Sequence, residues 1–446
     1  MFKLLLIWRY FLKKRVAWMA VIAVTLLVML ILVVLSVMSG LVEQARFRNH
    51  TWAGDLILTR DSLVGFPYYE QFISRLRHLD SVRYATPIIK TFALIDSTNP
   101  LQIVGLKPSD FDGNDAFTRF LKSSPNSDSF SFEVPANVLQ RSLQTITSEH
   151  KYRGCYVGTY APKFPLGAPL RLTVFALNSK GVLTGSELGE NQTFWQLTEH
   201  KTGLLDVDEA LLVDFDELQN LCWMAGQDGA PPRANEIRIR LKPGLRPETL
   251  QSEITRLWRQ FVDETSSNPD HPAGSALLAD VTVRTWRQYR RDFIAPMEKE
   301  KSLMIVVFSM IGFVAVFIVF AIFYMIVTEK IKDLGIVKSI GGSQWGLAQI
   351  FLGYGALVGL VGAALGTTLG WNIVTHSNQI EAWLNKHFQF KLWDPEVYAI
   401  VKIPDVVDTT QALIIAAIAI LTAILGAAVP ARRAAKLVVV EALRVE

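Results

Sequence analysis

Four long apolar segments dominate the pattern of hydrophobic and polar positions along the chain. They cover residues 16–42, 302–328, 347–371 and 410–429. A helix needs about 20 apolar residues to cross the hydrocarbon core of a bilayer, so each segment predicts a membrane-spanning helix. The basic residues before the first segment are also typical of a secretory signal. That segment is too long for a signal, however, and it lacks a small-x-small cleavage site, which indicates an uncleaved anchor.

The Lys and Arg residues that flank these segments predict the orientation of the chain. Basic residues near span ends are retained in the cytoplasm, and both termini carry them: Lys3, Arg9, Lys13, Lys14 and Arg15 at one end, and Arg432, Arg433, Lys436 and Arg444 at the other. We therefore expect both termini inside the cell. Residues 43–301 would then lie outside, residues 329–346 inside, and residues 372–408 in a second external loop.

The region between the first two spans predicts a mixed domain of helices and strands. Its clearest signals are strand-like alternation at 81–95, 236–241 and 277–285, a helix with apolar positions at 69–79, a helix from about Pro247, and a strand-rich middle at 134–213. These signals suggest two packed subdomains. The polar stretch KSSPNSDS at 122–129 predicts a flexible insertion.

The predicted fold class is therefore an α-helical membrane protein with four transmembrane helices and a large α+β extracytoplasmic domain inserted between helices 1 and 2. We expect residues 1–42 to form the cytoplasmic N-terminus and the first helix. Residues 43–301 would form the external domain, with its two subdomains. Residues 302–446 would form a permease-like domain that contains the internal segment 329–346.

Composition agrees with a membrane protein that carries a substantial water-soluble domain. Half of the residues are hydrophobic (50%), and the formal net charge of +4 is small and spread along the chain, so it indicates no nucleic-acid partner. The two cysteines, Cys155 and Cys222, both fall in the expected external domain, where oxidation is permitted. A disulfide and two separate thiols both stay open, because sequence does not give the distance between their Cα atoms. No Cys/His grouping has the spacing of a metal site, and we expect no cofactor.

Sequence motifs of nucleotide and peptide hydrolysis are missing from the chain. It contains no G-x-x-x-x-G-K-[ST] loop, no G-x-S-x-G elbow and no H-E-x-x-H motif. The apolar cores of the spans also carry no ionisable residue of the kind that ion-coupled pumps use. We therefore expect no catalytic residue in this chain, and energy for any transport must come from elsewhere.

The segment at 329–346 is amphipathic and lies between two spans. Its apolar stripe consists of Ile331, Leu334, Ile336, Val337 and Ile340, its charged positions are Glu329, Lys330, Lys332, Asp333 and Lys338, and Gly341-Gly342 should end the helix. Such a segment either lies on the bilayer surface or contacts a partner protein. The residues alone leave both alternatives open.

The third span carries a repeated glycine spacing. Its glycines are Gly355, Gly359, Gly362, Gly366 and Gly370, and the last three line one helical face. Small residues at this spacing let helix backbones approach closely in membranes. We expect them to pack the four-helix unit together, with a dimer face as the alternative.

Three stretches resemble the FtsX/MacB/LolC-type permeases of ABC transporters. They are VTEKIKDLGIVKSIGGS at 327–343, TWRQYRRDFIAPMEKEKSL at 285–303 and PARRAAKLVVVEALRVE at 430–446, the last with Val440 where that family usually has Pro. Two further stretches, LSVMSGL at 35–41 and LWDPEVYAIVKIPDVVD at 392–408, resemble the lipoprotein-releasing branch of this family. The second stretch includes Trp393, which either belongs to an interfacial aromatic belt or helps to shape a substrate entry site.

The resemblance implies a permease subunit in the bacterial inner membrane that works with a separate ABC ATPase and a second permease subunit, identical or paralogous. The substrate would be a lipid-anchored protein, and a periplasmic carrier for the product stays open. The residues implied in ATPase coupling are Glu329, Lys330, Leu334, Ile336, Val337, Lys338, Ile340 and Gly341. The acyl chains would lie between the first two spans, on a charge-free surface that includes Met29, Val33, Val37, Phe313 and Phe317. A MacB-like efflux motor and an FtsX-like signal transmitter to a cell-wall hydrolase are the alternatives.

Overall fold

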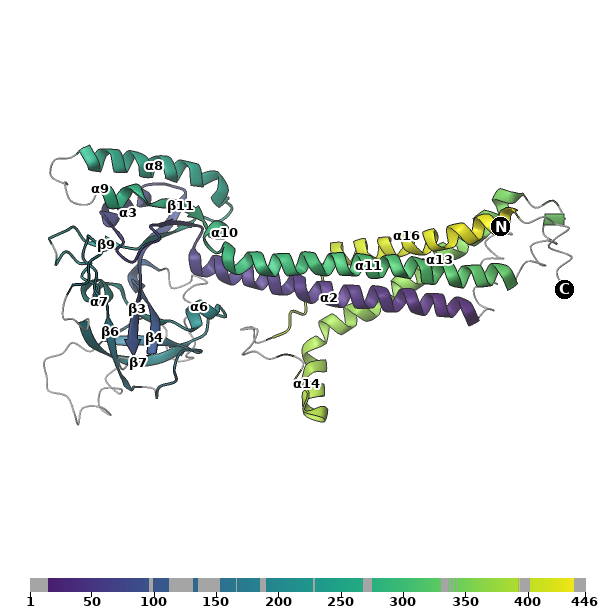
Figure 1. The fold of residues 1–446 in the computed structure, drawn as a ribbon, viewed down its shortest axis with the longest axis horizontal. Helices are drawn as coiled ribbons and strands as arrows, with labels where there is room; N and C mark the ends of the chain where they lie inside the picture. The colour runs from purple at the N-terminus through teal and green to yellow at the C-terminus, as the bar shows by residue number, and fades with distance from the viewer. Residues whose placement is uncertain are drawn as a thin grey trace. The chain divides into compact units, whose positions relative to one another are not determined.

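The computed structural model forms two compact units, shown in Figure 1. The helical unit comprises Met1–Gln44 and Ala295–Glu446, and the sheet unit comprises Ala45–Ile294. The structure describes residues 15–95, 99–111, 131–134, 153–165, 167–184, 190–227, 229–267, 275–329, 336, 338–339, 341, 343–391, 393 and 402–436.

Long helices build the helical unit. They are α2 (Arg15–Ala53), α11 (Arg291–Glu329), α13 (Gln344–Thr375) and α16 (Thr409–Lys436). Among the described residues these are the four helices that are long and apolar enough to cross a membrane, which confirms the four predicted spans. The helices α2 and α11 have 39 residues each, or about 58 Å at 1.5 Å per residue, whereas the hydrocarbon core is about 30 Å thick. Both helices therefore extend well beyond their apolar segments and into the residue range of the sheet unit.

Glycines of α13 allow the closest helix contacts in the helical unit. A Cβ atom added at Gly366 would lie 2.7 Å from the Thr25 carbonyl oxygen of α2, and one at Gly362 would lie 2.8 Å from Val24 Cβ. On the side that faces α16, a Cβ at Gly355 would lie 2.6 Å from Ala427 Cβ. The remaining two follow the same division, with Gly359 against Ala423 of α16 and Gly370 against Leu32 of α2. The helix α13 is thus held between α2 and α16.

The remaining long helix packs on the same apolar core. A Cβ at Gly426 of α16 would lie 2.8 Å from Val319 Cγ1 of α11, and the Phe323 ring of α11 lies 5.2 Å from the Tyr354 ring of α13. The contacts of α2 with α13, α13 with α16, and α16 with α11 make the four helices one packed body. Helix packing of this closeness leaves little room for one span to move without its neighbours.

One mixed sheet forms the centre of the sheet unit. In the described residues it has nine strands in the order β11-β1-β10-β3-β4-β8-β5-β7-β6. Their bounds are β1 (Leu56–Thr59), β3 (Val82–Ile95), β4 (Asn99–Leu106), β5 (Gly154–Gly158), β6 (Pro169–Val174), β7 (Glu190–His200), β8 (Leu211–Asp214), β10 (Glu236–Leu241) and β11 (Thr282–Thr285). A small second sheet pairs β2 (Phe66–Pro67) with β9 (Arg233–Ala234).

The long strand β3 belongs to two parts of the sheet. Its first half pairs with β10 as far as Ile88, and its second half pairs with β4 from Ile89 onward. Its last residues, 93–95, also pair with β6. The strands β3, β4, β8, β5, β7 and β6 therefore close into a ring, whereas β11, β1 and β10 continue from β3 as an open part. Closure of the ring removes free strand edges on that side.

Helices cover the open part of the sheet. They are α3 (Tyr69–Arg77) and α8 (Pro247–Ser267), and their aromatic side chains meet in the core, where the Phe72 ring lies 4.8 Å from Trp258 and 5.3 Å from Phe261. The shorter helices are α6 (Leu205–Asp208), α7 (Phe215–Leu221), α9 (Ser275–Ala279) and α10 (Trp286–Tyr289). Two of these, α6 and α10, carry or precede residues of the candidate site described below.

Most strand and helix predictions agree with the structure, with one correction. The strands predicted at 81–95 and 236–241 and the helices predicted at 69–79 and from Pro247 are confirmed. The strand predicted at 277–285 is wrong in its first half, because residues Ser275–Ala279 form α9 and the strand begins only at Thr282. A short apolar run does not distinguish a buried helix turn from a strand. The insertion at 122–129 lies outside the described residues.

Both cysteines are free thiols in the structure, and both are buried. Burial raises the pKa of Cys222 to about 12, and it raises the pKa of Cys155 well above the ordinary value. A buried, protonated thiol is a poor nucleophile, so neither cysteine is suited to thiolate chemistry.

The glycine contacts predict a specific pattern of stability. Gly366→Ala should lower the stability of the helical unit by about 1–3 kcal/mol, because the new methyl group would meet the backbone of α2 and force the helices apart. Gly312→Ala in α11 is the matched control, since a Cβ there meets nothing within 4 Å. Thermal unfolding of the purified chain in detergent, followed by circular dichroism, measures both. Equal melting of the two variants would show that the α2–α13 contact is looser than described.

Candidate functional site

The segment between α11 and α13 contains Gly341, at which the sequence predicts that its helix ends. Of the eight residues implied in ATPase coupling, the structure describes four: Glu329, Ile336, Lys338 and Gly341. The other four, Lys330, Leu334, Val337 and Ile340, lie outside the described residues. The Gly341 N–H donates to the Lys338 carbonyl at 3.1 Å, with φ +97°, a left-handed conformation that favours glycine. The apolar side chain of Ile336 is 50% exposed. The segment thus presents at least one large apolar side chain to its surroundings.

A lysine ties this segment to the last helix of the unit. The Lys338 Nζ donates to the Ala435 carbonyl at 3.1 Å, in the final turn of α16. The last carbonyls of a helix lack backbone partners and carry partial negative charge, so an ammonium group is favourable there. Arg433, in the same turn, lies with its guanidinium 5.2 Å from the centre of the Tyr324 ring of α11. The segment, α16 and the end of α11 are therefore joined at one end of the helical unit.

The residues expected to line a substrate surface lie on two neighbouring helices. Met29, Val33 and Val37 are half-buried on α2, whereas Phe313 and Phe317 are exposed on α11 with their rings 5.1 Å apart. Val37 and the indole of Trp393 pack on a small cluster, together with Met297 and Met304 of α11. This cluster brings α2 and α11 side by side. The structure therefore places the five residues on adjacent helices, with the phenylalanines outward.

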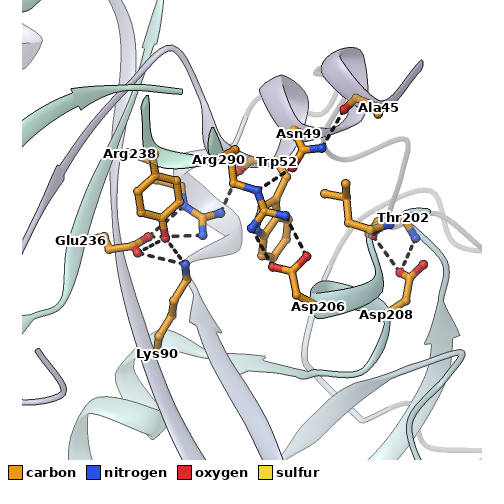
Figure 2. A network of polar contacts seen from close by, with 12 residues as sticks. Ala45, Asn49, Trp52, Lys90, Thr202, Asp206, Asp208, Glu236, Arg238 and Arg290 are labelled. Carbon is orange, nitrogen blue, oxygen red and sulfur yellow. Dashed lines mark hydrogen bonds and ion pairs between the residues drawn. The ribbon is translucent and has the colours of Figure 1, made fainter. Parts of the chain in front are cut away.

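A buried arginine joins the far ends of α2 and α11 within the sheet unit, and Figure 2 shows its partners. Arg290 lies between α10 and α11. Its two Nη atoms donate to the two carboxylate oxygens of Asp206, each at 2.7 Å, and its Nε donates to Asn49 Oδ1 at 2.6 Å. Asn49 belongs to α2, and its Nδ2 donates to the Ala45 carbonyl at 2.8 Å. We call Asn49, Asp206 and Arg290 the helix joint, because they link α2, α6 and the start of α11.

The helix joint is held by charge and by geometry. The Arg290 side chain is only 4% exposed, so its pairing with Asp206 is largely shielded from water. Asp208 fixes the turn that carries Asp206 by accepting hydrogen bonds from the Thr202 N–H at 2.6 Å and from the Thr202 hydroxyl at 2.8 Å. A bidentate arginine–carboxylate pair is stronger and more directional than a single contact. Each of the three joint residues is therefore fixed by its own element.

A second buried network lies beside the helix joint, as Figure 2 shows. The Glu236 carboxylate of β10 accepts from Lys90 at 2.9 Å and from Arg238 at 3.4 Å, and the Tyr289 hydroxyl of α10 also donates to it. Arg238 donates in turn to the Trp52 carbonyl of α2 at 2.9 Å, with its guanidinium 4.5 Å from the centre of the Trp52 ring. This network ties α2 and α10 to the sheet.

Electrostatics keep the Glu236 network charged at neutral pH. Burial alone would raise the pKa of Glu236, but the nearby Lys90 and Arg238 and the Tyr289 hydrogen bond lower it to about 2. For Lys90, burial acts to lower the pKa, and the adjacent carboxylate of Glu236 outweighs it, so the pKa is raised. Because the folded pKa of Glu236 is depressed, its stabilising effect is complete above the unfolded value and is lost as pH falls toward 2. The network therefore stays intact through the physiological range.

The end of α2 is fixed immediately after the helix stops. Gly54 has φ +83° and ends the helix, which is the usual role of glycine at this position. The next residue, Asp55, accepts from the Leu241 N–H of β10 at 2.8 Å and pairs with the His50 ring at 2.7 Å. Burial acts to raise the pKa of Asp55, but the hydrogen bond from His50 and the charge of Arg240 hold it below the usual value. The end of α2 is thereby tied to the last residue of β10.

Sequence reasoning did not find the helix joint. Arg290 is 241 positions from Asn49 and 84 from Asp206, so no local pattern connects the three. The run of basic and aromatic residues at 286–291, directly before an apolar segment, was the one signal present. The strand predicted at 236–241 alternates apolar residues with Arg238 and Arg240, a pattern typical of a strand with one polar face, yet Arg238 is buried.

Comparison with known proteins gives a family for part of the chain. Residues 305–439 match the FtsX-like permease C-terminal family. The chain is 33% identical over 170 residues to the lipoprotein-releasing system transmembrane protein LolC of Neisseria meningitidis serogroup B, covering 37% of this chain. It is 28% identical over 141 residues to the corresponding LolE protein of Haemophilus influenzae, covering 31% of this chain. The chain spans 40% and 33% of the lengths of these two relatives.

A solved structure resembles the chain at a lower level. The periplasmic region of MacB from Actinobacillus actinomycetemcomitans has 10% sequence identity and a TM-score of 0.29, and the alignment covers 53% of this chain and 91% of that one. This likeness is too weak to support an argument. The family match, the two relatives and the four spans are consistent with the motifs at 285–303, 327–343 and 430–446. Residues 305–439 therefore match the FtsX-like permease family, and the chain is similar to permeases of lipoprotein-releasing systems.

Proposed function

We propose that this chain is the membrane subunit of an ABC transporter that releases lipid-anchored proteins from the outer leaflet of the bacterial inner membrane. ATP would be hydrolysed by a separate subunit. The relatives named as lipoprotein-releasing system transmembrane proteins support this substrate class. The observation that carries the proposal of a mechanical subunit is the helix joint, in which Arg290 fastens the far ends of α2 and α11 to each other and to α6.

Movement would begin at the internal segment. With both termini in the cytoplasm, residues 329–346 face the ATPase, and Ile336 offers an apolar contact to it. Closure of the ATPases would displace the segment, and the Lys338–Ala435 hydrogen bond would pass the displacement to α16. Because its glycines hold α13 closely against α16 and α2, the displacement would not be absorbed between these helices. The spans would thus shift together.

The external domain would respond because α2 and α11 are continuous helices. Both run from residues of the helical unit into residues of the sheet unit without a break. At their far ends the helix joint and the Glu236 network prevent the helices from sliding relative to the sheet. Displacement of the spans is therefore converted into displacement of the external domain, and no substrate has to pass through the membrane.

Two permease subunits would form the working unit. Relatives of this chain carry two different names, LolC and LolE, which supports pairing with a paralogue over pairing with a second copy. The acyl chains of the substrate would lie between α2 and α11 at the junction of the two subunits. Phe313 and Phe317 are exposed on α11, and burial of lipid against such side chains would contribute about 0.8 kcal/mol per CH₂ group.

The coupling role predicts the effect of a charge in the internal segment. Ile336→Asp should weaken association with the ATPase by at least about 100-fold, because an unpaired carboxylate would be desolvated in the contact. Ile336→Leu is the matched control and should bind normally. Co-purification from membranes and ATPase turnover in the reconstituted complex measure both effects. Normal binding and turnover of the Asp variant would reject the coupling role.

The substrate role predicts which molecule touches α2. A photo-crosslinker at Met29 or Val33 should capture an acylated lipoprotein without ATP and lose it when ATP and the ATPase are added. The same protein without its acyl chains should never be captured, because affinity comes from the buried lipid. Mass spectrometry of the crosslinked product provides the measurement. Capture that is independent of acylation would favour a MacB-like efflux motor, and capture of phospholipid alone would favour an FtsX-like signal transmitter.

A further inference from the structure

The segment after α13 contains an amphipathic helix where the sequence predicted an external loop. This helix, α14 (Ser377–Phe388), begins two residues after α13 ends at Thr375. Its large apolar side chains recur at helical spacing on one face: Ile380, Trp383, Leu384 and Phe388. Trp383 is 53% exposed and Phe388 is 66% exposed, and no residue of α14 is buried. Among the residues that the structure describes, none buries this apolar face.

The position of α14 follows from the length of the span before it. The apolar segment of α13 ends near Trp371, and α14 begins six residues later, or about 9 Å at 1.5 Å per residue. The headgroup layer is about 5–8 Å thick on each side of the hydrocarbon core. The first turn of α14 therefore starts at the outer boundary of this layer, and a helix that runs across the membrane normal there stays in contact with it.

Hydrogen bonds fix the first turn of α14 at this level. The Asn378 side chain donates to the Ile403 carbonyl at 2.9 Å and accepts from the Ile403 N–H at 2.9 Å. Five residues later, the Asp408 carboxylate accepts from the Thr410 N–H at 2.8 Å and caps the start of α16. The root of α14 is thus held between the adjoining ends of α13 and α16. Figure 1 shows α14 turning across the direction of α13.

We propose that α14 lies in the membrane interface at this end of the spans, with Trp383 and Phe388 at the boundary between headgroups and acyl chains. The occupant of its apolar face is phospholipid, because α14 begins two residues after the span α13, whose Leu365 and Leu369 are exposed near the same end. Tryptophan is favoured at this depth, and an amphipathic helix with one aromatic face is typical of interfacial anchoring.

The aromatic side chains of α14 are arranged for this role, and the opposite face suits water. The Trp383 ring lies 5.7 Å from the Phe388 ring and 4.9 Å from the His387 ring, so they form one contiguous surface. Ala382 and Asn385 lie on the other side of the helix and are exposed. The anchor would set the depth and tilt of α13, whose glycines contact α2 and α16. It does not depend on the substrate or on the ATPase.

Site-specific fluorescence in lipid tests this placement. Single cysteines at Trp383 and Phe388, and at Ala382 and Asn385 as matched controls, are introduced into the full chain after replacement of Cys155 and Cys222 by Ala. Each is labelled with bimane and reconstituted into nanodiscs that contain brominated phosphatidylcholine. All four positions are half-exposed or exposed, so the label replaces no core contact.

The expected result is a contrast between the two faces. Brominated lipid should quench the labels at 383 and 388 several-fold more than those at 382 and 385, and aqueous iodide should show the opposite order. Equal access of iodide to all four labels would overturn the proposal, because the helix would then stand in water. Protection of 383 and 388 from both quenchers would also overturn it, because a protein surface would then cover the face.

Discussion

The architecture of this protein depends on the buried contacts of the Arg290 guanidinium. The guanidinium pairs with both carboxylate oxygens of Asp206 and with the amide oxygen of Asn49, and it is almost completely withdrawn from water. A buried charge that loses its partner costs about 3–5 kcal/mol, so the three elements that supply these groups are strongly held in one arrangement. The arrangement includes the end of α2 and the beginning of α11, which are also the two helices that lead toward the membrane.

The two ends of the helical system are built by different physical means. At the end of α16 the Lys338–Ala435 hydrogen bond ties the segment 329–346 to this helix, and Ile336 is exposed. In the sheet unit, the helix ends are fixed by bidentate pairing, by a stacked Arg238–Trp52 contact and by a depressed Glu236 pKa. The Lys338–Ala435 contact is suited to a position that shifts when a partner binds. The buried networks of the sheet unit are suited to transmitting force without rearranging, because breaking them would leave buried charges unpaired. Between them, glycine contacts keep the spans in close register.

The spans and several strands could be predicted from sequence because their signals are local. Hydrocarbon thickness requires a long apolar run, and alternation identified β10 with its bounds. The division of β3 between two parts of the sheet could not be predicted, since it depends on partners far apart in the chain. The same holds for Asn49, Asp206 and Arg290. The helix α14 is different: its apolar spacing at 380, 383, 384 and 388 is present in the sequence, but residues 372–408 were interpreted only as the connection between two spans. Of the coupling residues, the structure describes Glu329, Ile336, Lys338 and Gly341. Gly341 has the left-handed conformation expected where a helix ends, and the coupling role stays a prediction.

In the proposed mechanism, force passes through the helix joint. The amount of lipoprotein released per ATP hydrolysed measures this transmission most directly. Arg290→Lys keeps the charge but loses the bidentate geometry and the Nε contact with Asn49. The helix joint should then no longer hold α2, α6 and α11 in one arrangement when force acts on it. Arg75→Lys is the control, because Arg75 forms an exposed pair with Glu264 at 2.6 Å elsewhere in the same unit. The account predicts that the Arg290 variant hydrolyses ATP at the normal rate and releases at least about fivefold less lipoprotein per ATP, whereas the control behaves as the unaltered protein. Unchanged release per ATP in the Arg290 variant, with the variant folded, would contradict it.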